Sequence, residues 1–166
     1  MSGPTLTAAP LTEEAFRPFG DLISATGTPD MMINGVRCGR FHDLARLSFG
    51  TGQAGISIFR TDAVTIPCRV ELVERHPVGS QAFLPMTDGP WLVVVAEDVD
   101  GQPGPLHAFM AAPEQGVNYL AGTWHAPLLA LRDGAVFAVV DRIGSGDNLQ
   151  ECWLPEPVTV TAPAVV

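Results

Sequence analysis

Prolines and glycines occur along the whole of this sequence and limit the length of any regular element. The 166 residues include 15 prolines and 17 glycines. Proline breaks the interior of a helix and glycine weakens it, so this punctuation favours many short strands over long helices. Apolar residues make up 46% and charged residues 16%, which is typical of a globular chain. No internal repeat or low-complexity linker interrupts the sequence, and we expect residues 1–166 to form a single domain.

Strand patterns dominate the segments between these turns. Trp91–Ala96 is a continuous apolar run, which is typical of a strand covered on both faces. Further strands are predicted around Ile56 and Ile58 and over 70–76, 106–110, 124–131 and 135–140. Strands at this spacing, with almost no helical periodicity, predict an all-β fold: a compact barrel or a double-sheet jelly roll.

Local signals near the N-terminus predict two small elements. Thr12, followed by two glutamates, predicts the N-cap of a helix, and nearby proline and glycine limit this helix to one or two turns. Residues 31–33 and 36–38 are predicted to pair as a hairpin, with Asn34-Gly35 in a type I′ turn. Helix content is therefore expected to be low, with one or two short helices.

Charge and residue usage exclude several classes of function. The formal net charge of −9 argues against a nucleic-acid partner, because binding phosphates requires clustered cations. All 9 cations are arginine, and the absence of lysine excludes Schiff-base catalysis. Cys38, Cys68 and Cys152 are far apart and form no CxxC pair, so we expect free thiols and neither a zinc ribbon nor a disulfide framework.

No targeting or membrane signal is present in the sequence. Residues 1–10 lack a basic stretch followed by an apolar one, so no signal peptide is expected. The run Trp91–Ala96 is far too short to span a bilayer. We therefore expect a cytoplasmic protein without a membrane partner.

The first candidate site lies at the end of a predicted strand. Glu74 and His76 point to the same face of a regular strand as Val70 and Leu72, whereas Arg75 points to the other face. A carboxylate and an imidazole in an apolar cavity are costly without partners, so their burial would mark a functional site. The alternative interpretation is a strand end that turns into solvent.

A second candidate lies in the segment 116–127. Asn118 and Tyr119, and then Trp124 and His125, follow glycines and enter another predicted strand. A lone histidine is more often a core or surface residue than a catalyst. Two strands that each carry a histidine can nevertheless converge on one pocket inside a small barrel.

The third candidate is Asp141-Arg142, at the end of the apolar strand predicted over 135–140. Arginine binds carboxylates through two parallel hydrogen bonds, so Arg142 is a candidate clamp for a substrate carboxylate. The alternative interpretation is an exposed strand end with an ordinary Asp–Arg pair.

Together, these segments resemble a known family. The runs Glu-Arg-His-Pro at 74–77 with Gln-Ala-Phe at 81–83, and Gly-Val-Asn-Tyr at 116–119 with Trp124-His125, closely resemble the ureidoglycolate lyase family. The resemblance covers nearly the whole chain in the same order. It implies a cupin-like double-stranded β-barrel and a homodimer. It also implies an enzyme that cleaves (S)-ureidoglycolate to glyoxylate and urea in allantoin and purine degradation.

The resemblance also bears on a cofactor. The family is associated with nickel, and a cupin usually presents a histidine-rich set of metal ligands. The corresponding residues here form a mixed set: Glu74, His76, Gln81 and His125. If a divalent metal is bound, we expect His76, Gln81 and His125 to be its ligands.

Cleavage of ureidoglycolate requires only two proton movements. A base removes the hydroxyl proton, and an acid supports the departing urea nitrogen. We expect Glu74, His76 and His125 to line the pocket of this small anionic substrate, with His125 as the favoured base and His76 or Glu74 as the acid. The residues expected to bind the substrate are Arg75, Gln81, Asn118, Tyr119, Trp124 and Arg142. Of the two arginines, Arg142 is favoured as the carboxylate clamp.

Two other functions remain open at this point. One is a metal-dependent cupin isomerase or dioxygenase acting on a small organic acid. The other is a non-catalytic cupin that binds a small acid as a sensor; the apolar tail 154–166 would then be a partner or dimer element, although packing across the barrel is the simpler expectation.

Overall fold

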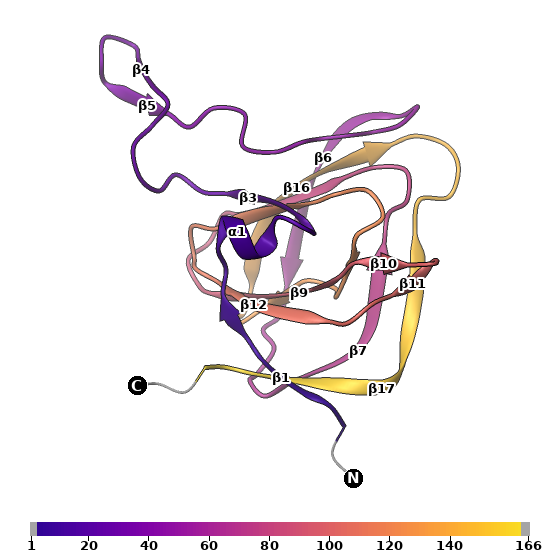
Figure 1. Ribbon diagram of the computed structural model, residues 1–166. Coiled ribbons are helices and arrows are strands. Elements are labelled where there is room, and N and C mark those ends of the chain that lie inside the picture. The colour runs from indigo at the N-terminus through magenta and orange to yellow at the C-terminus, as the bar shows by residue number, and fades with distance from the viewer. Residues whose placement is uncertain (1–2, 164–166) are drawn as a thin grey trace.

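The computed structural model describes residues 3–163, and almost all of its regular elements are strands (Figure 1). One helix, α1 (Glu13–Phe16), is found in this part of the chain. The side chain of Thr12 accepts a hydrogen bond from the backbone N–H of Ala15 at 3.2 Å, which is the predicted N-cap. No helix among the described residues is long and apolar enough to cross a membrane.

The larger of the two main sheets has eight strands and is mostly antiparallel, with a parallel pair at each edge. Its strands, in spatial order, are β1 (Thr5–Thr7), β17 (Gln150–Thr161), β7 (Cys68–Arg75), β14 (Trp124–His125), β9 (Trp91–Ala96), β12 (His107–Ala111) and β2 (Ala9–Pro10), with β15 (Leu129–Ala130) also paired to β9.

The smaller main sheet has five antiparallel strands. In spatial order they are β3 (Gly20–Ile23), β13 (Gly116–Tyr119), β8 (Gln81–Pro85), β16 (Ala135–Ile143) and β6 (Gln53–Thr61). Two separate pairs complete the described elements: β4 (Met31–Ile33) with β5 (Cys38–Arg40), and β10 (Asp98–Val99) with β11 (Gln102–Pro103). The β4–β5 hairpin projects from the body of the molecule (Figure 1).

Two apolar cores hold these sheets together, and β9 contributes to both. Its residues Trp91, Val93 and Val95 lie in the main core with side chains of the five-stranded sheet. The alternate residues of β9 lie in a second core together with Trp124 and Val160. The eight-stranded sheet bends so that β1 and β17 pass on the other side of β9 and β12 (Figure 1). The prediction of a strand covered on both faces is thus confirmed.

Two predicted strands differ from the observed ones in extent. The strand predicted over 124–131 is split into β14 and β15, because Pro127 between them has no N–H to donate to a neighbouring strand. The hairpin pairs Ile33 with Cys38, so its loop has four residues and not the predicted two. Val36 has a φ of 60°, which is incompatible with the predicted strand 36–38.

The C-terminal segment packs across the barrel as expected. The strand β17 pairs with β7 and with β1, and its Val160 is fully buried in the second core. Residues 164–166 of the predicted tail lie outside the described part of the chain.

Candidate active site

The pairing of β7 with β14 places two of the candidate residues side by side. His125 is directly opposite Glu74 in this antiparallel register, and it is also opposite Val95 of the main core. Both side chains therefore lie on the face of the sheet that looks toward the five-stranded sheet. Val70 does not share this face, contrary to prediction. It lies with Val73 in the second core, so β7 changes face between these two residues.

His76, just beyond the end of β7, joins this pair. One ligand atom from each of Glu74, His76 and His125 lies within 4.8 Å of the others. The two imidazole rings are 5.5 Å apart between centroids. His125 is 2% exposed, whereas Glu74 and His76 are half-buried. The structure thus brings together three side chains that are up to 51 positions apart in the sequence.

Backbone carbonyl groups fix the orientation of both imidazoles. The Nδ1 atom of His76 is 2.7 Å from the carbonyl oxygen of Asn148, and Nδ1 of His125 is 3.0 Å from that of Ala126. Because a carbonyl only accepts hydrogen bonds, each ring carries a proton on Nδ1. Both Nε2 atoms are buried, and nothing among residues 3–163 bonds to them. These nitrogens are therefore available to a substrate or a metal ion.

Burial changes the proton affinities of the cluster in opposite directions. It lowers the pKa of His125 to about 3, and the nearby charge of His76 contributes in the same direction. It raises the pKa of Glu74, an effect that His76 opposes and Glu151 reinforces. His125 is thus neutral at physiological pH, and its low affinity for a proton argues against the expected role as base. Glu74 is a stronger base than an ordinary carboxylate.

Tyr119 forms one wall of the cluster. Its ring stacks on that of His125 with centroids 4.2 Å apart and planes 2° from parallel. Burial raises the pKa of its hydroxyl, and the charge of Glu74 raises it further. Tyr119 is therefore a neutral side chain that holds the imidazole of His125 in place.

The donor set fits a divalent metal ion. Two imidazole Nε2 atoms without protein partners and one carboxylate converge within coordination reach of a common centre. In addition, Nδ1 of each histidine is hydrogen-bonded to a backbone carbonyl group, which is the usual arrangement that orients a metal-binding imidazole.

A groove of about 500 Å³ leads to Glu74 from the surface. Its walls come from β6, β8 and the residues that precede β15, and they combine polar and apolar surface in similar shares. The lining residues are Ile58, Phe59, Arg60, Thr61, Glu74, Phe83, Pro127 and Leu128. A small molecule can therefore reach the carboxylate of the cluster between the two sheets.

Gln81 lies on the same inner face as Tyr119. It is 5% exposed and pairs across the sheet with Tyr119 on one side and Asp141 on the other. Asp141 continues the inward-facing alternation of Phe137 and Val139 on β16, and it accepts a hydrogen bond from Nε2 of Gln81 at 3.1 Å. The alternation of that apolar strand was the signal that could have identified Asp141, which the sequence prediction passed over in favour of Arg142.

Arg142 is directed elsewhere. It follows Asp141 on β16 and so lies on the opposite face. Its guanidinium donates to the backbone carbonyl of Ser145 at 2.7 Å, within the turn after β16. The structure therefore does not bring Arg142 to the cluster, where it was expected to clamp a carboxylate.

Arg75 and Trp124 lie on the other side of the eight-stranded sheet. The guanidinium of Arg75 contacts Asp98 at 2.6 Å and lies 4.7 Å from the centroid of the Trp124 ring. The indole N–H of Trp124 donates to the same carboxylate at 3.0 Å. These contacts attach the β10–β11 hairpin to the sheet and leave neither side chain at the cluster, contrary to the expected binding role.

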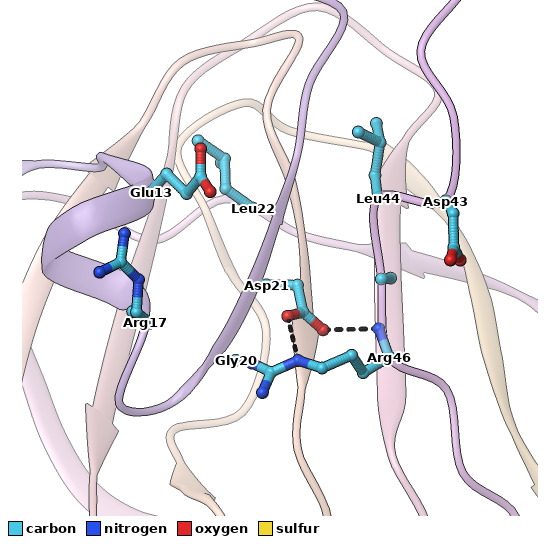
Figure 2. Close-up of a pocket in the computed structure, with 9 residues that line it drawn as sticks. Glu13, Arg17, Gly20, Asp21, Leu22, Asp43, Leu44 and Arg46 are labelled. Atoms are coloured by element: carbon cyan, nitrogen blue, oxygen red, sulfur yellow. Dashed lines mark hydrogen bonds and ion pairs between the residues drawn. The ribbon is translucent and has the colours of Figure 1, made fainter. Parts of the chain in front are cut away.

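Asn118 is also outside the cluster, because it alternates with the inward-facing Val117 and Tyr119. Its amide donates to Asp21 at 2.9 Å and to the carbonyl of Arg46 at 3.2 Å. Figure 2 shows Asp21 directed at the backbone and guanidinium of Arg46, beside a separate pocket of about 410 Å³. Asn118 thus fixes the 41–50 segment against the outer face of β13.

Comparisons with known proteins give the family. The sequence model of the ureidoglycolate lyase family matches residues 3–161. The chain belongs to this family. The expected resemblance is therefore confirmed over nearly the whole length of the chain.

Several relatives of this chain are named ureidoglycolate lyase. The ureidoglycolate lyase of Rhodobacter capsulatus is 56% identical over 156 residues, which cover 93% of this chain and 97% of that protein. That of Brucella melitensis is 50% identical and covers 92% of this chain and 91% of its own length. That of Chelativorans is 44% identical over 95% of this chain and 97% of its own length.

A solved structure supports the predicted fold class. A dTDP sugar isomerase from Desulfovibrio desulfuricans superposes with a TM-score of 0.50 over 81% of this chain and 85% of its own. At 16% identity, this likeness concerns the fold alone. Together with the two facing sheets, it confirms an all-β, cupin-like barrel with one very short helix among the described residues.

Proposed function

We propose that this protein is a lyase that cleaves ureidoglycolate into glyoxylate and urea. Its membership of the ureidoglycolate lyase family supports this function over an isomerase, a dioxygenase or a non-catalytic sensor. The observation that carries the proposal is the convergence of Glu74, His76 and His125 inside a chain of this family. Such a cluster supplies the base and the acid that the reaction requires.

Glu74 is the general base of the proposed reaction. Glu74 lines the groove, and burial raises its pKa, so it accepts a proton more readily than an exposed glutamate. It removes the hydroxyl proton of ureidoglycolate while the carbonyl of glyoxylate forms and the carbon–nitrogen bond breaks. No water is added, so the products are glyoxylate and urea.

The two histidines act on the rest of the substrate. His76, held by Asn148 through Nδ1, acts in its imidazolium form: it delivers the Nε2 proton to the departing urea nitrogen and keeps the Nδ1 proton on the carbonyl of Asn148. His125 is neutral, and its Nε2 lone pair is free to accept a hydrogen bond from an N–H group of the substrate. The proposed base is therefore Glu74 and not His125, as the sequence had suggested, because burial makes the imidazole the weaker base of the two.

Glu74, His76 and His125 would hold a divalent metal such as nickel, the metal implied by the family resemblance. When bound, such an ion supplies Lewis-acid polarisation of the substrate hydroxyl or carboxylate. Gln81, also expected as a ligand, presents an oxygen acceptor on the same inner face.

We further infer that the protein is a cytoplasmic homodimer and that each subunit binds the small anionic substrate. All three cysteines are free thiols, which fits a reducing compartment. Ile56 and Ile58 on the outer face of the edge strand β6 are 77% and 59% exposed, which supports a subunit interface there.

Release of glyoxylate from ureidoglycolate, followed with a coupled assay, tests the function. The wild-type protein should release glyoxylate and urea in equal amounts. Glu74→Gln, His76→Ala and His125→Ala should each lower kcat by about 10²–10⁴-fold, the usual contribution of acid–base groups.

His42→Ala is the matched control, since His42 is exposed and far from the cluster in the sequence. This variant should keep the wild-type kcat. An inactive wild-type protein, or near-normal activity in all three cluster variants, would contradict the proposed function.

A further inference from the structure

The pair formed by Gln81 and Asp141 is not used by the acid–base chemistry above, although it lies on the same inner face. Gln81 is directly opposite Tyr119 in the β8–β13 register, and Tyr119 stacks on His125 at 4.2 Å. Directly opposite residues of antiparallel strands have their Cβ atoms about 5 Å apart. Asp141, Gln81 and Tyr119 thus form a row across the five-stranded sheet that ends at the cluster.

Asp141 fixes the orientation of the Gln81 amide. A carboxylate has no proton to donate at neutral pH, so only the NH₂ group of Gln81 can bond to it, at 3.1 Å. The amide oxygen Oε1 must therefore point away from Asp141. Oε1 is buried, and no group within the described residues 3–163 donates to it. A buried acceptor without a donor costs stability, so Oε1 is an acceptor that a ligand's N–H group can satisfy.

We propose that Asp141 is a positioning residue that holds Oε1 of Gln81 as an acceptor for an N–H group of the substrate's ureido end. This inference rests on the proposed function, because the ureido group is the part of ureidoglycolate that carries N–H donors. A ligand that has a methylene or methyl group where ureidoglycolate has an N–H group leaves Oε1 unpaired, so the site binds that ligand less tightly. Asp141 and Gln81 thus select a ureido acid over an acid of the same shape without N–H groups.

Two non-reactive acids provide matched probes. N-carbamoylglycine has the ureido group and carboxylate but no hydroxyl group to react. Levulinate has the same chain length and carbonyl, with a methylene and a methyl in place of the two nitrogens. Calorimetric titration measures both affinities without turnover. The wild-type protein should bind N-carbamoylglycine up to about tenfold more tightly, since one hydrogen bond contributes up to about 1.5 kcal/mol.

Asp141→Asn should remove most of this preference, because an asparagine can donate to Oε1 and let the Gln81 amide turn over. Gln81→Glu combined with Asp141→Asn should restore it. In that double variant, the amide of residue 141 donates to one oxygen of residue 81 and leaves the other oxygen as the acceptor. A purely structural role for Asp141 would not produce such a recovery.

Glu71→Gln on the exposed face of β7 is the control for a carboxylate-to-amide change and should keep the preference. Thermal unfolding verifies that each variant is folded. The inference is wrong if Asp141→Asn keeps the wild-type preference, or if the folded double variant fails to recover it. It is also wrong if Asp141→Asn changes the amount of bound metal, which would assign Oε1 to a metal ion. Failure of the wild type to release glyoxylate would instead contradict the proposed function.

Discussion

At the scale of single residues, the burial of Glu74 favours catalysis but lowers the stability of the fold. Burial raises its pKa, which means that the folded protein disfavours the charged carboxylate. Below the pKa of the unfolded state both forms are protonated and this cost is absent, and it grows as the pH rises from there through the raised pKa of the folded state. The same effect makes the carboxylate a better base, so a group that the proposed reaction needs is one that destabilises the fold.

Glu74→Gln should therefore be inactive and yet more stable than the wild type near neutral pH. Each kcal/mol recovered should raise Tm by about 2–4 °C in a chain of this size. The gain should shrink as the pH is lowered below the raised pKa of Glu74, and it should vanish below the pKa of an unfolded glutamate, where the wild-type carboxyl is neutral in both states. Calorimetric scans across this pH range measure the effect. Glu71→Gln is the exposed control, and a loss of stability in Glu74→Gln at neutral pH would refute the argument.

Which face a side chain occupies could be predicted only in part from the sequence. Period-two alternation correctly grouped Glu74 with His76 and separated both from Arg75. The same alternation places Trp124 and Asn118 on the opposite faces from His125 and Tyr119, so the prediction that all four bind the substrate was inconsistent with it. It also missed the change of face in β7, which occurs where the register with β17 shifts between Trp153 and Val158.

At the scale of elements, the pairing of β3 with β13 positions Tyr119 against His125. Gly20 is opposite Tyr119 in this register, and the chains approach so closely that a Cβ on Gly20 would lie 1.8 Å from the carbonyl oxygen of Asn118. Backbone atoms cannot move aside as a flexible side chain can. A methyl group here must separate the two strands and shift Tyr119.

Gly20→Ala should lower the free energy of unfolding by about 1–3 kcal/mol, the usual cost of overpacking, and should also lower kcat. Chemical denaturation and the glyoxylate assay measure the two effects. Gly104→Ala is the matched control, because a Cβ there meets a methyl group of Val99 at 3.0 Å and the carbonyl oxygen of Glu97 at 3.2 Å, which are much looser contacts. Equal stability of the two variants would show that the β3–β13 contact does not constrain Tyr119.

At the scale of the whole molecule, the fold class followed from the sequence but the order of the strands did not. Proline, glycine and apolar alternation act locally, and they were sufficient to predict an all-β chain. The contact between Glu74 and His125 depends on pairing β7 with the two-residue strand β14, about 50 positions away. Such a short strand has no periodicity of its own, so only the assembled sheet brings the cluster together.

The burial of His125 makes the stability of the folded protein depend on pH. Its pKa is about 3 in the folded protein, whereas an unfolded chain binds the proton near pH 6.5. Between these values the unfolded state holds a proton that the folded state does not, so stability falls as the pH is lowered, by up to ~1.4 kcal/mol per pH unit. His125→Asn should show a shallower decline between about pH 6.5 and pH 4 in chemical denaturation. His42→Asn, at an exposed position, should follow the wild type. Parallel curves for the wild type and His125→Asn would mean that His125 is not held neutral in the core.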